Sequence, residues 1–329
     1  MIIRIARMLV AVVLVLSLIQ ALPVAAQAQP FCFAEVPDCI EGRFLEYWSQ
    51  NGALVVFGYP IGPAHIEDVD GKPYLAQAFE RNRFELHPEF PAPYDVLLGR
   101  LGSDRLAQLG RPWEGLPPAT ADAPPGDCRA FAETEHRVCN EFLRYWLSHG
   151  LRLDDDFYFS TEESLALFGF PISEPGFERD SDGTPYLVQW FERARIELHQ
   201  EYGPGLMLLG RLGSEIVDQA PGMQPLTPPA DLAAVPPATN AVMSPASGPA
   251  GLTFLATGVG MPWGDPITVT VTMPDQSLYR SPFSVRAAMD GRSDTVFITT
   301  DVQAQRGIWT IRFEALDGLI QGVASFRVW

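Results

Sequence analysis

The residues best suited to chemistry are arginines, glutamates and histidines that recur in two related stretches. The stretches read Glu80-Arg81-Asn82-Arg83-Phe84-Glu85-Leu86-His87 and Glu192-Arg193-Ala194-Arg195-Ile196-Glu197-Leu198-His199. Alternation at the end of each stretch is typical of a strand, with the charged side chains on one face and the apolar ones on the other. Glu85 and Glu89 could act as an acid-base pair, and His87 beside them could bind a metal or carry protons.

Three interpretations of these charged strands stay open. Opposite charges at alternating positions can neutralise one another, which predicts an ion-pair ladder that stabilises the fold. A recognition surface is the second interpretation, and its binding residues are Arg81, Arg83, Glu85, His87, Arg193, Arg195, Glu197 and His199. The third is a hydrolase of cell-wall polymers that uses Glu80, Glu85 or Glu89. Because the sequence lacks a nucleophile elbow and a phosphate-binding glycine loop, we expect no catalytic residue, metal or cofactor.

The charged strands are expected to follow a tight hairpin. Phe79 is out of phase with Phe84, so one unbroken strand would split the apolar residues between two faces. A hairpin that turns at residues 81 to 82 restores the phase, and it places Phe79 opposite Phe84 and Glu80 opposite Arg83. A continuous bulged strand is the alternative, since Arg-Asn is a poor two-residue turn.

The charged strands belong to a longer internal repeat. Residues 57–89 and 168–201 are closely similar, and each is preceded by FLEYW or FLRYW and followed by LLGRLGS. Duplication favours binding or structural units, because a catalytic centre needs one constellation whereas binding gains from repetition. We therefore expect α+β tandem repeats, each a helix plus small antiparallel strands, followed by an all-β immunoglobulin-like sandwich.

An aromatic stripe predicts one helix near the start of each copy. In the first copy Phe44, Tyr47 and Trp48 follow Ile40 at the spacing of one helix face. Packing in the core is the first interpretation of this face, and a sugar-stacking platform is the alternative. The corresponding residues of the second copy are Val138, Phe142, Tyr145 and Trp146.

Glycine and serine residues predict where helices end and begin. Gly52 and Gly150 are expected to end the aromatic helices in the left-handed conformation. Ser103 and Ser214 are expected to cap the start of a short helix in each copy.

Four cysteines precede these helices as one pair in each copy. The expected disulfides join Cys32 to Cys39 and Cys128 to Cys139, because each pair is close in sequence and belongs to its own copy. Zinc binding is the alternative, although neither pair has the C-x-x-C spacing common in structural zinc sites. Disulfides would place the protein in an oxidising compartment.

The N-terminus and the net charge point to export. Two arginines, an apolar run over residues 8–19 and Ala26-Gln27-Ala28 predict a signal peptide cleaved after Ala28, with an uncleaved membrane anchor as the alternative. We expect no other membrane span. The net charge of -17 argues against nucleic acid and anionic lipid as partners. The protein is expected to be secreted or extracellular, either free or associated with the cell envelope.

Proline-rich stretches and a change of pattern predict the domain organisation. From residue 251 onward the chain alternates over five strands, 267–273, 283–289, 295–300, 308–313 and 323–328, as in a small β-sandwich. The expected divisions are a signal peptide at 1–28, repeat domain 1 at 29–113, a Pro-rich linker at 114–127, repeat domain 2 at 128–220, a Pro/Ala/Thr-rich linker at 221–250 and the immunoglobulin-like sandwich at 251–329.

The repeated motifs resemble a known family. Phe57-Gly58-Tyr59-Pro60 and Phe168-Gly169-Phe170-Pro171, followed by Q-x-F-E-R, ELH and LLGRLG, resemble the LGFP repeat of secreted bacterial cell-wall-associated proteins. Asn82 and Ala194 replace that family's turn glycine, and the helix with its cysteines is foreign to the family pattern. The resemblance implies association with the cell envelope, not catalysis, and an envelope glycan or a surface protein as partner. The C-terminal part resembles immunoglobulin-like modules of bacterial surface proteins, a likeness of fold alone.

Overall fold

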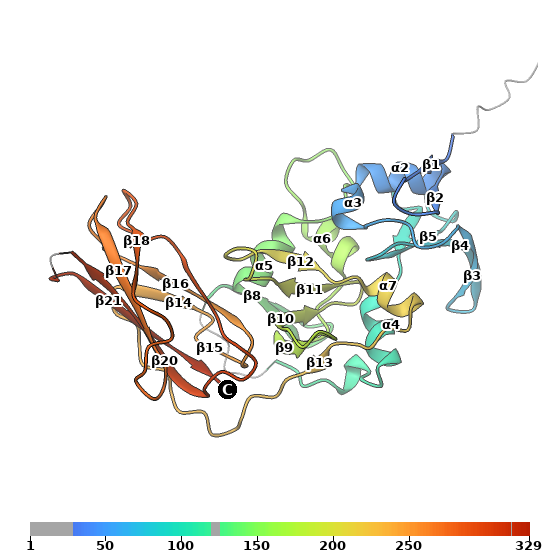
Figure 1. Ribbon diagram of the computed structural model, residues 1–329. Helices are drawn as coiled ribbons and strands as arrows, with labels where there is room; N and C mark the ends of the chain where they lie inside the picture. Colours follow the sequence, from blue (N-terminus) through green and yellow to red (C-terminus); the bar gives the residue numbers. More distant parts are fainter. Residues whose placement is uncertain (1–28, 120–125, 317) are drawn as a thin grey trace, which may run out of the picture.

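A computed structural model describes residues 29–119, 126–316 and 318–329 (Figure 1), so the predicted signal peptide lies outside the described residues. These residues form six α-helices of four to nine residues and 21 strands in six small sheets. All neighbouring strands but β15 and β21 run antiparallel. The prediction of α+β tandem repeats is therefore wrong, because strands dominate and the few helices are short.

The first copy combines a small hairpin, helices and a four-stranded sheet. Its hairpin is β1 (Phe31–Cys32) and β2 (Cys39–Ile40), followed by α2 (Gly42–Gln50) and α3 (Ala53–Val56). The sheet has the order β3-β4-β5-β6 and consists of β3 (His65–Val69), β4 (Lys72–Ala78), β5 (Arg83–Leu86) and β6 (Val96–Leu98). Helix α4 (Leu101–Gln108) and the 3-10 helix η1 (Trp113–Gly115) complete this copy.

The second copy has the same order of elements, except that a further strand follows its last helix where the first copy has η1. It begins with β7 (Cys128–Phe131), β8 (His136–Cys139), α5 (Asn140–Ser148) and α6 (Thr161–Phe168). Its sheet has the order β12-β11-β10-β9-β13 and consists of β9 (Gly176–Arg179), β10 (Pro185–Trp190), β11 (Arg195–Leu198), β12 (Met207–Leu209) and β13 (Gln224–Pro225). Helix α7 (Leu212–Val217) lies between β12 and β13. The fifth strand, β13, comes from the segment 221–250.

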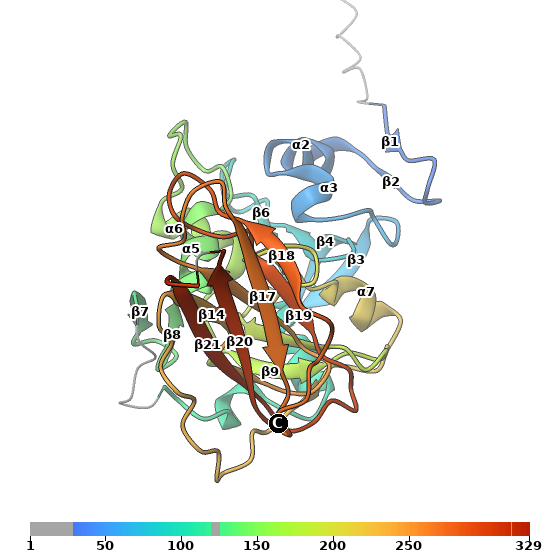
Figure 2. The same cartoon turned by 60° about the vertical axis from the view of Figure 1, so that its left-hand side comes forward.

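The C-terminal part is a sandwich of two sheets (Figures 1 and 2). One apolar core between them includes Phe254, Trp309 and Phe326. One sheet, β14-β16-β19, consists of β14 (Ala241–Ser244), β16 (Thr253–Gly258) and β19 (Val296–Thr299). The other, β15-β21-β20-β17-β18, consists of β15 (Ser247–Gly248), β17 (Pro266–Thr272), β18 (Phe283–Arg286), β20 (Gly307–Ala315) and β21 (Gln321–Val328).

Strands fall on both sides of the predicted boundary at residue 251. Each of the five predicted sandwich strands overlaps an observed strand. The segment 221–250 is not a linker throughout, because β13 joins the second copy and both β14 and β15 belong to the sandwich. Sequence alternation missed these strands because they are short and lie among prolines and alanines.

The two copies share one hydrophobic core. Phe44, Tyr47 and Trp48 of α2 are almost completely buried, which confirms that the aromatic face packs in the core. The same apolar cluster contains Phe142 and Trp146 of α5. The copies are therefore joined into one N-terminal body, residues 29–119 and 126–228, rather than two independent units.

Backbone groups of each copy also cap a helix of the other. The N–H groups of Gly102 and Ser103 donate to the carbonyl oxygen of Glu192, at 3.0 and 3.1 Å, and Ser214 N–H donates to the Glu80 carbonyl at 3.1 Å. The helices begin at Leu101 and Leu212. The predicted serine caps are wrong, because a carbonyl of the opposite copy accepts the N–H bonds that a cap side chain would accept.

The glycine predictions have different outcomes in the two copies. Gly52 has a φ of 100° and follows α2, as predicted. Gly150 does not end α5 in the left-handed conformation, because the helix leaves through His149 in an extended conformation.

Candidate functional site

A tight hairpin joins β4 to β5 in the first copy and β10 to β11 in the second. The hairpin is confirmed, but its predicted register is wrong: Phe79 N–H donates to the Asn82 carbonyl at 2.8 Å, and Ala78 pairs with Arg83. The turn lies at residues 80–81 rather than 81–82. Glu80 is therefore not opposite Arg83, and its backbone carbonyl points to the other copy, where it caps α7.

In the first copy the charged strand forms an ion-pair ladder. Two guanidinium nitrogens of Arg83 bind Glu85 Oε1, at 2.6 and 2.9 Å, and a third donates to Glu67 Oε1 at 3.0 Å. His87 Nε2 lies 3.6 Å from Glu85 Oε2, and its Nδ1 lies 3.1 Å from Glu89 Oε1. Glu85 is only 5% exposed. The side chains of this strand therefore pair with one another, although His87 Nε2 has no hydrogen-bond partner.

The second copy repeats the ladder with a more deeply buried arginine. Arg195 donates to Glu197 Oε1 at 2.7 Å and to Glu215 Oε1 at 2.6 Å. His199 lies between two carboxylates, with Nε2 at 2.9 Å from Glu197 and Nδ1 at 2.8 Å from Glu201. Arg195 is 3% exposed, so this pair is taken almost wholly out of water.

These contacts shift the protonation equilibria of the second ladder. Burial raises the pKa of Glu197, but the charge of Arg195 and hydrogen bonds from His199 and Arg195 outweigh it, so the pKa lies below its ordinary value. Burial lowers the pKa of His199, but hydrogen bonds to Glu197 and Glu201 raise it above its ordinary value. Both shifts favour the charged forms. Glu197 is held as a carboxylate and is poorly suited to act as an acid.

Arg81 and Arg193 join the copies to each other. Arg81 Nε donates to the Leu209 carbonyl at 3.3 Å, and Arg193 Nε donates to the Leu98 carbonyl at 3.2 Å. These reciprocal bonds hold the end of each sheet to the hairpin of the other copy.

A further ion pair links the helices α4 and α7. Arg105, which is 1% exposed, lies 3.3 Å from Glu215, and Glu215 in turn binds Arg195. The second ladder therefore continues into the first copy. Of the eight predicted binding residues, the structure places six on two ladders and two at the contact between copies.

The predicted disulfides are confirmed. Cys32 is bonded to Cys39 and Cys128 to Cys139. Each pair faces across its own two-stranded hairpin, just before α2 or α5.

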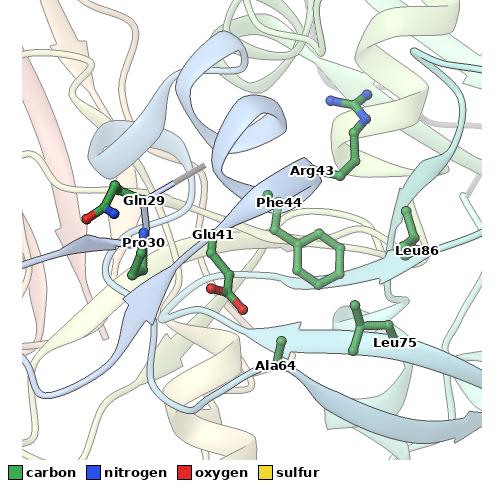
Figure 3. Close-up of a pocket in the computed structure, with 9 residues that line it drawn as sticks. Gln29, Pro30, Glu41, Arg43, Phe44, Ala64, Leu75 and Leu86 are labelled. Atoms are coloured by element: carbon green, nitrogen blue, oxygen red, sulfur yellow. The ribbon is translucent and has the colours of Figure 1, made fainter. Parts of the chain in front are cut away.

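The first copy has a groove between the start of α2 and its sheet (Figure 3). Its volume is about 460 Å³. Figure 3 shows the Phe44 side chain pointing from the helix toward the strands that carry Leu75 and Leu86. Arg43 at the rim is held by two hydrogen bonds of 2.8 Å to Asp95. The remaining lining residues are Gln29, Pro30, Glu41, Gly42 and Ala64.

The second copy has a groove at the corresponding place, with a volume of about 730 Å³. Phe142 and Leu187 line it where Phe44 and Leu75 line the first groove. Its other walls include prolines of the proline-rich segments that flank this copy, among them Pro117, Pro118, Pro225 and Pro228. Sequence reasoning missed both grooves. The recurrence of FLEYW and PYL motifs at matched positions was the available signal.

Comparison with known proteins gives little. No family model matches the chain, and no curated protein matches it. One similar solved structure is a Salmonella alpha-2-macroglobulin mutant, at 18% identity and a TM-score of 0.23, over 47% of this chain and 11% of that one. So slight a likeness carries no argument about fold or function, and the LGFP resemblance stays a prediction.

The described part of the chain offers neither a membrane-spanning helix nor a metal-binding cluster. None of its helices combines the length and the apolar character needed to cross a membrane. Within the same residues, no group of three or more His, Cys, Asp and Glu side chains could hold a metal ion.

Proposed function

We propose that this chain is a non-catalytic binding protein that acts outside the cell and recognises a surface-protein partner through its duplicated N-terminal body. The observation that carries the proposal is the recurrence of one groove, at corresponding positions, in both copies. Each groove sets an aromatic ring of a helix, Phe44 or Phe142, against a half-buried leucine of a sheet. Concave, partly apolar surfaces of this kind suit binding.

The state of the carboxylates supports binding over hydrolysis. Glycoside hydrolysis needs one carboxylic acid and one carboxylate that reach the substrate. Glu85 and Glu197 are 5% and 8% exposed, and each lies between an arginine and a histidine. Glu80 binds Arg211 of the other copy and accepts a hydrogen bond from Tyr59 N–H at 3.2 Å. The carboxylates of Glu80, Glu85 and Glu197 are therefore held in contacts that stabilise the fold.

Two disulfides are consistent with a protein that folds in an oxidising compartment. Together with the predicted signal peptide and the acidic net charge, they support a place in the medium or at the cell envelope.

A retention experiment tests the proposal. The mature chain, residues 29–329, is immobilised and exposed to surface proteins and, separately, to purified envelope glycan of the producing organism. Retention of a protein that is lost in Leu75→Glu but kept in Val55→Ser would support it, because Leu75 lines the groove and Val55 is 84% exposed outside the groove.

Other outcomes would overturn the proposal. Retention of glycan without protein would make the chain a glycan-binding module. Release of soluble fragments from envelope polymer, abolished by Glu85→Gln or Glu197→Gln in a chain that still folds, would make it a hydrolase.

A further inference from the structure

The sheets of the two copies end differently at one edge. In the second copy β13 lies antiparallel beside β9 and pairs Pro225 with Glu178. Leu226 N–H, just beyond β13, donates to the Phe177 carbonyl at 2.8 Å. A segment of the chain itself therefore covers this edge with main-chain hydrogen bonds.

The equivalent edge of the first copy is open. Strand β3 ends its sheet, and within the described residues no strand pairs with its outer side. Figure 1 shows β3 at the side of the molecule away from the sandwich. Natural proteins commonly cover or protect such edges, because their free N–H and C=O groups can pair with another chain.

The register identifies which backbone groups are free. Ile66 pairs with Leu75 in β4 just as Phe177 pairs with Leu187 in β10, so Ile66 and Phe177 hold equivalent places. The N–H and C=O of one residue in a strand point to the same side. Because the Phe177 carbonyl points to the added segment, both peptide groups of Ile66 point to the open edge. Its side chain is 66% exposed, which leaves an apolar contact uncovered.

The groove of the first copy adjoins this edge. Leu75, the partner of Ile66 across the strands, lines the groove, and so does Ala64, which directly precedes β3. In the second copy the segment that covers the edge continues as Leu226-Thr227-Pro228 along the corresponding groove. One extended segment can therefore occupy the edge and the groove together.

The acidic charge of β3 argues against another molecule of this protein as the occupant. Strand β3 carries Glu67 and Asp68, and Asp70 follows it, so pairing of two β3 edges would bring acidic groups together. The covering segment in the second copy, residues 223–229, has no charged side chain. A neutral or basic segment would meet no such repulsion.

We propose that the β3 edge and its groove bind an extended, proline-containing, neutral or basic segment of the partner protein, which adds to the sheet as a fifth strand. This inference rests on the proposed function and names the chemistry of its partner. Main-chain hydrogen bonds would provide affinity, and the groove would provide specificity. Prolines keep such a segment extended before it binds, which lowers the entropic cost of ordering.

The probe for this site is the heptapeptide Met-Gln-Pro-Leu-Thr-Pro-Pro, the sequence of residues 223–229. Its binding to the mature chain is followed by fluorescence anisotropy. We expect saturable binding that Ile66→Pro weakens about three- to tenfold, since the substitution removes one N–H donor at the open edge. The matched control Ile66→Val keeps the donor and should bind like the unsubstituted chain.

A second arm needs no change to the protein. Methylation of the leucine nitrogen in the peptide removes the donor equivalent to Leu226 N–H and should weaken binding to a similar degree. If Ile66→Pro does not fold, Leu75→Glu replaces it, because Leu75 lines the groove of the first copy and not that of the second. No saturable binding would overturn the inference. Binding that leucine methylation weakens but Ile66→Pro leaves unchanged would also overturn it, because the leucine N–H donates at β9 as well and this pattern would indicate exchange there. Binding unchanged by both modifications would overturn it too, since no main-chain hydrogen bond at this edge would then be involved.

The two proposals fail in different ways. Capture of a surface protein that is unaffected by Ile66→Pro would remove this inference and leave the proposed function. Capture of no surface protein, with no binding of the heptapeptide, would remove both.

Discussion

The same residue types should contribute different amounts of stability in the two ladders, because the arginines differ in burial and in their partners. Arg195 is held by Glu197 and Glu215, each at 2.6 Å, with the arginine side chain 4% exposed. Arg83 has a 20% exposed side chain, and Asp104, on the helix that corresponds to that of Glu215, is 3.9 Å away. Removal of one partner from a buried ion pair leaves an uncompensated charge, whereas a partly exposed charge is still solvated.

Glu197→Gln should therefore cost more stability than Glu85→Gln. We expect a loss of about 3 kcal/mol for Glu197→Gln, because Arg195 and His199 both lose a buried carboxylate. For Glu85→Gln we expect about 1 kcal/mol, since Arg83 is partly solvated and still binds Glu67. Urea denaturation of the two variants measures both values. Equal losses would show that burial does not decide the strength of the ladders.

The His199 contacts also predict how stability depends on pH. The pKa of His199 is raised above 6.5 by hydrogen bonds to Glu197 and Glu201, so its contribution is complete below 6.5 and is lost as the pH rises through the folded-state pKa. The pKa of Glu197 is lowered from 4.5, so its contribution is present above 4.5 and is lost as the pH falls through the folded-state value.

The stabilisation from this pair should be largest between pH 4.5 and 6.5. The free energy of unfolding that His199→Gln removes should therefore be greater at a pH near 6 than at a pH near 8.5. Urea denaturation at both pH values gives the comparison. A loss that does not change with pH would mean that His199 is neutral in the folded protein.

At the scale of elements, the start of each LGRLGS helix is fixed by the other copy. A Cβ atom added at Gly102 would lie 1.9 Å from the Phe191 carbonyl oxygen, and one added at Gly213 would lie 1.9 Å from the Phe79 carbonyl oxygen. Glycine is thus required in a first helical turn where alanine would otherwise be favoured. Glycine is needed because the backbones of the two copies approach each other closely at this point. The sequence of one copy alone does not reveal this contact.

Gly102→Ala and Gly213→Ala should each destabilise the N-terminal body by about 2 to 3 kcal/mol, although helix propensity alone would favour alanine by about 1 kcal/mol. The contact is backbone to backbone, so no side chain can move aside. Gly62→Ala is the matched control, because no atom lies within 4 Å of the added Cβ. Thermal unfolding distinguishes them, and an unchanged or raised melting temperature in both variants would contradict the capping contact.

At the scale of the molecule, the features that were predicted correctly from the sequence depend on residues close together in the chain. The cysteine pairs, the buried face of α2 and five sandwich strands are local in sequence, and each is present. The shared core, the added strand β13 and the two grooves depend on segments far apart. Arg81, for example, binds a carbonyl 128 residues away. No period or motif in either copy carries that information, so the charged strands could not be assigned to ladders or to the contact between copies.

The sandwich is held to the second copy by contacts that lie beyond the connecting segment. The Phe177 ring packs edge-on against Trp329 at 5.8 Å, and Arg179 donates to the Ala250 carbonyl at 3.4 Å. Residues 229–238 between β13 and β14 are almost all exposed and have no strand pairing. Such segments are cut most readily by proteases.

Limited proteolysis should therefore cut first within residues 229–238, and the two fragments should remain together. Size-exclusion chromatography under native conditions should give one peak, and a denaturing gel should separate its fragments. Phe177→Ala should let the fragments separate, because it removes the ring that packs on Trp329. Ile66→Ala is the matched control, since Ile66 holds the equivalent place in the first copy and is 66% exposed. Separate peaks from the cut, unsubstituted chain would mean that only the connecting segment holds the sandwich to the N-terminal body.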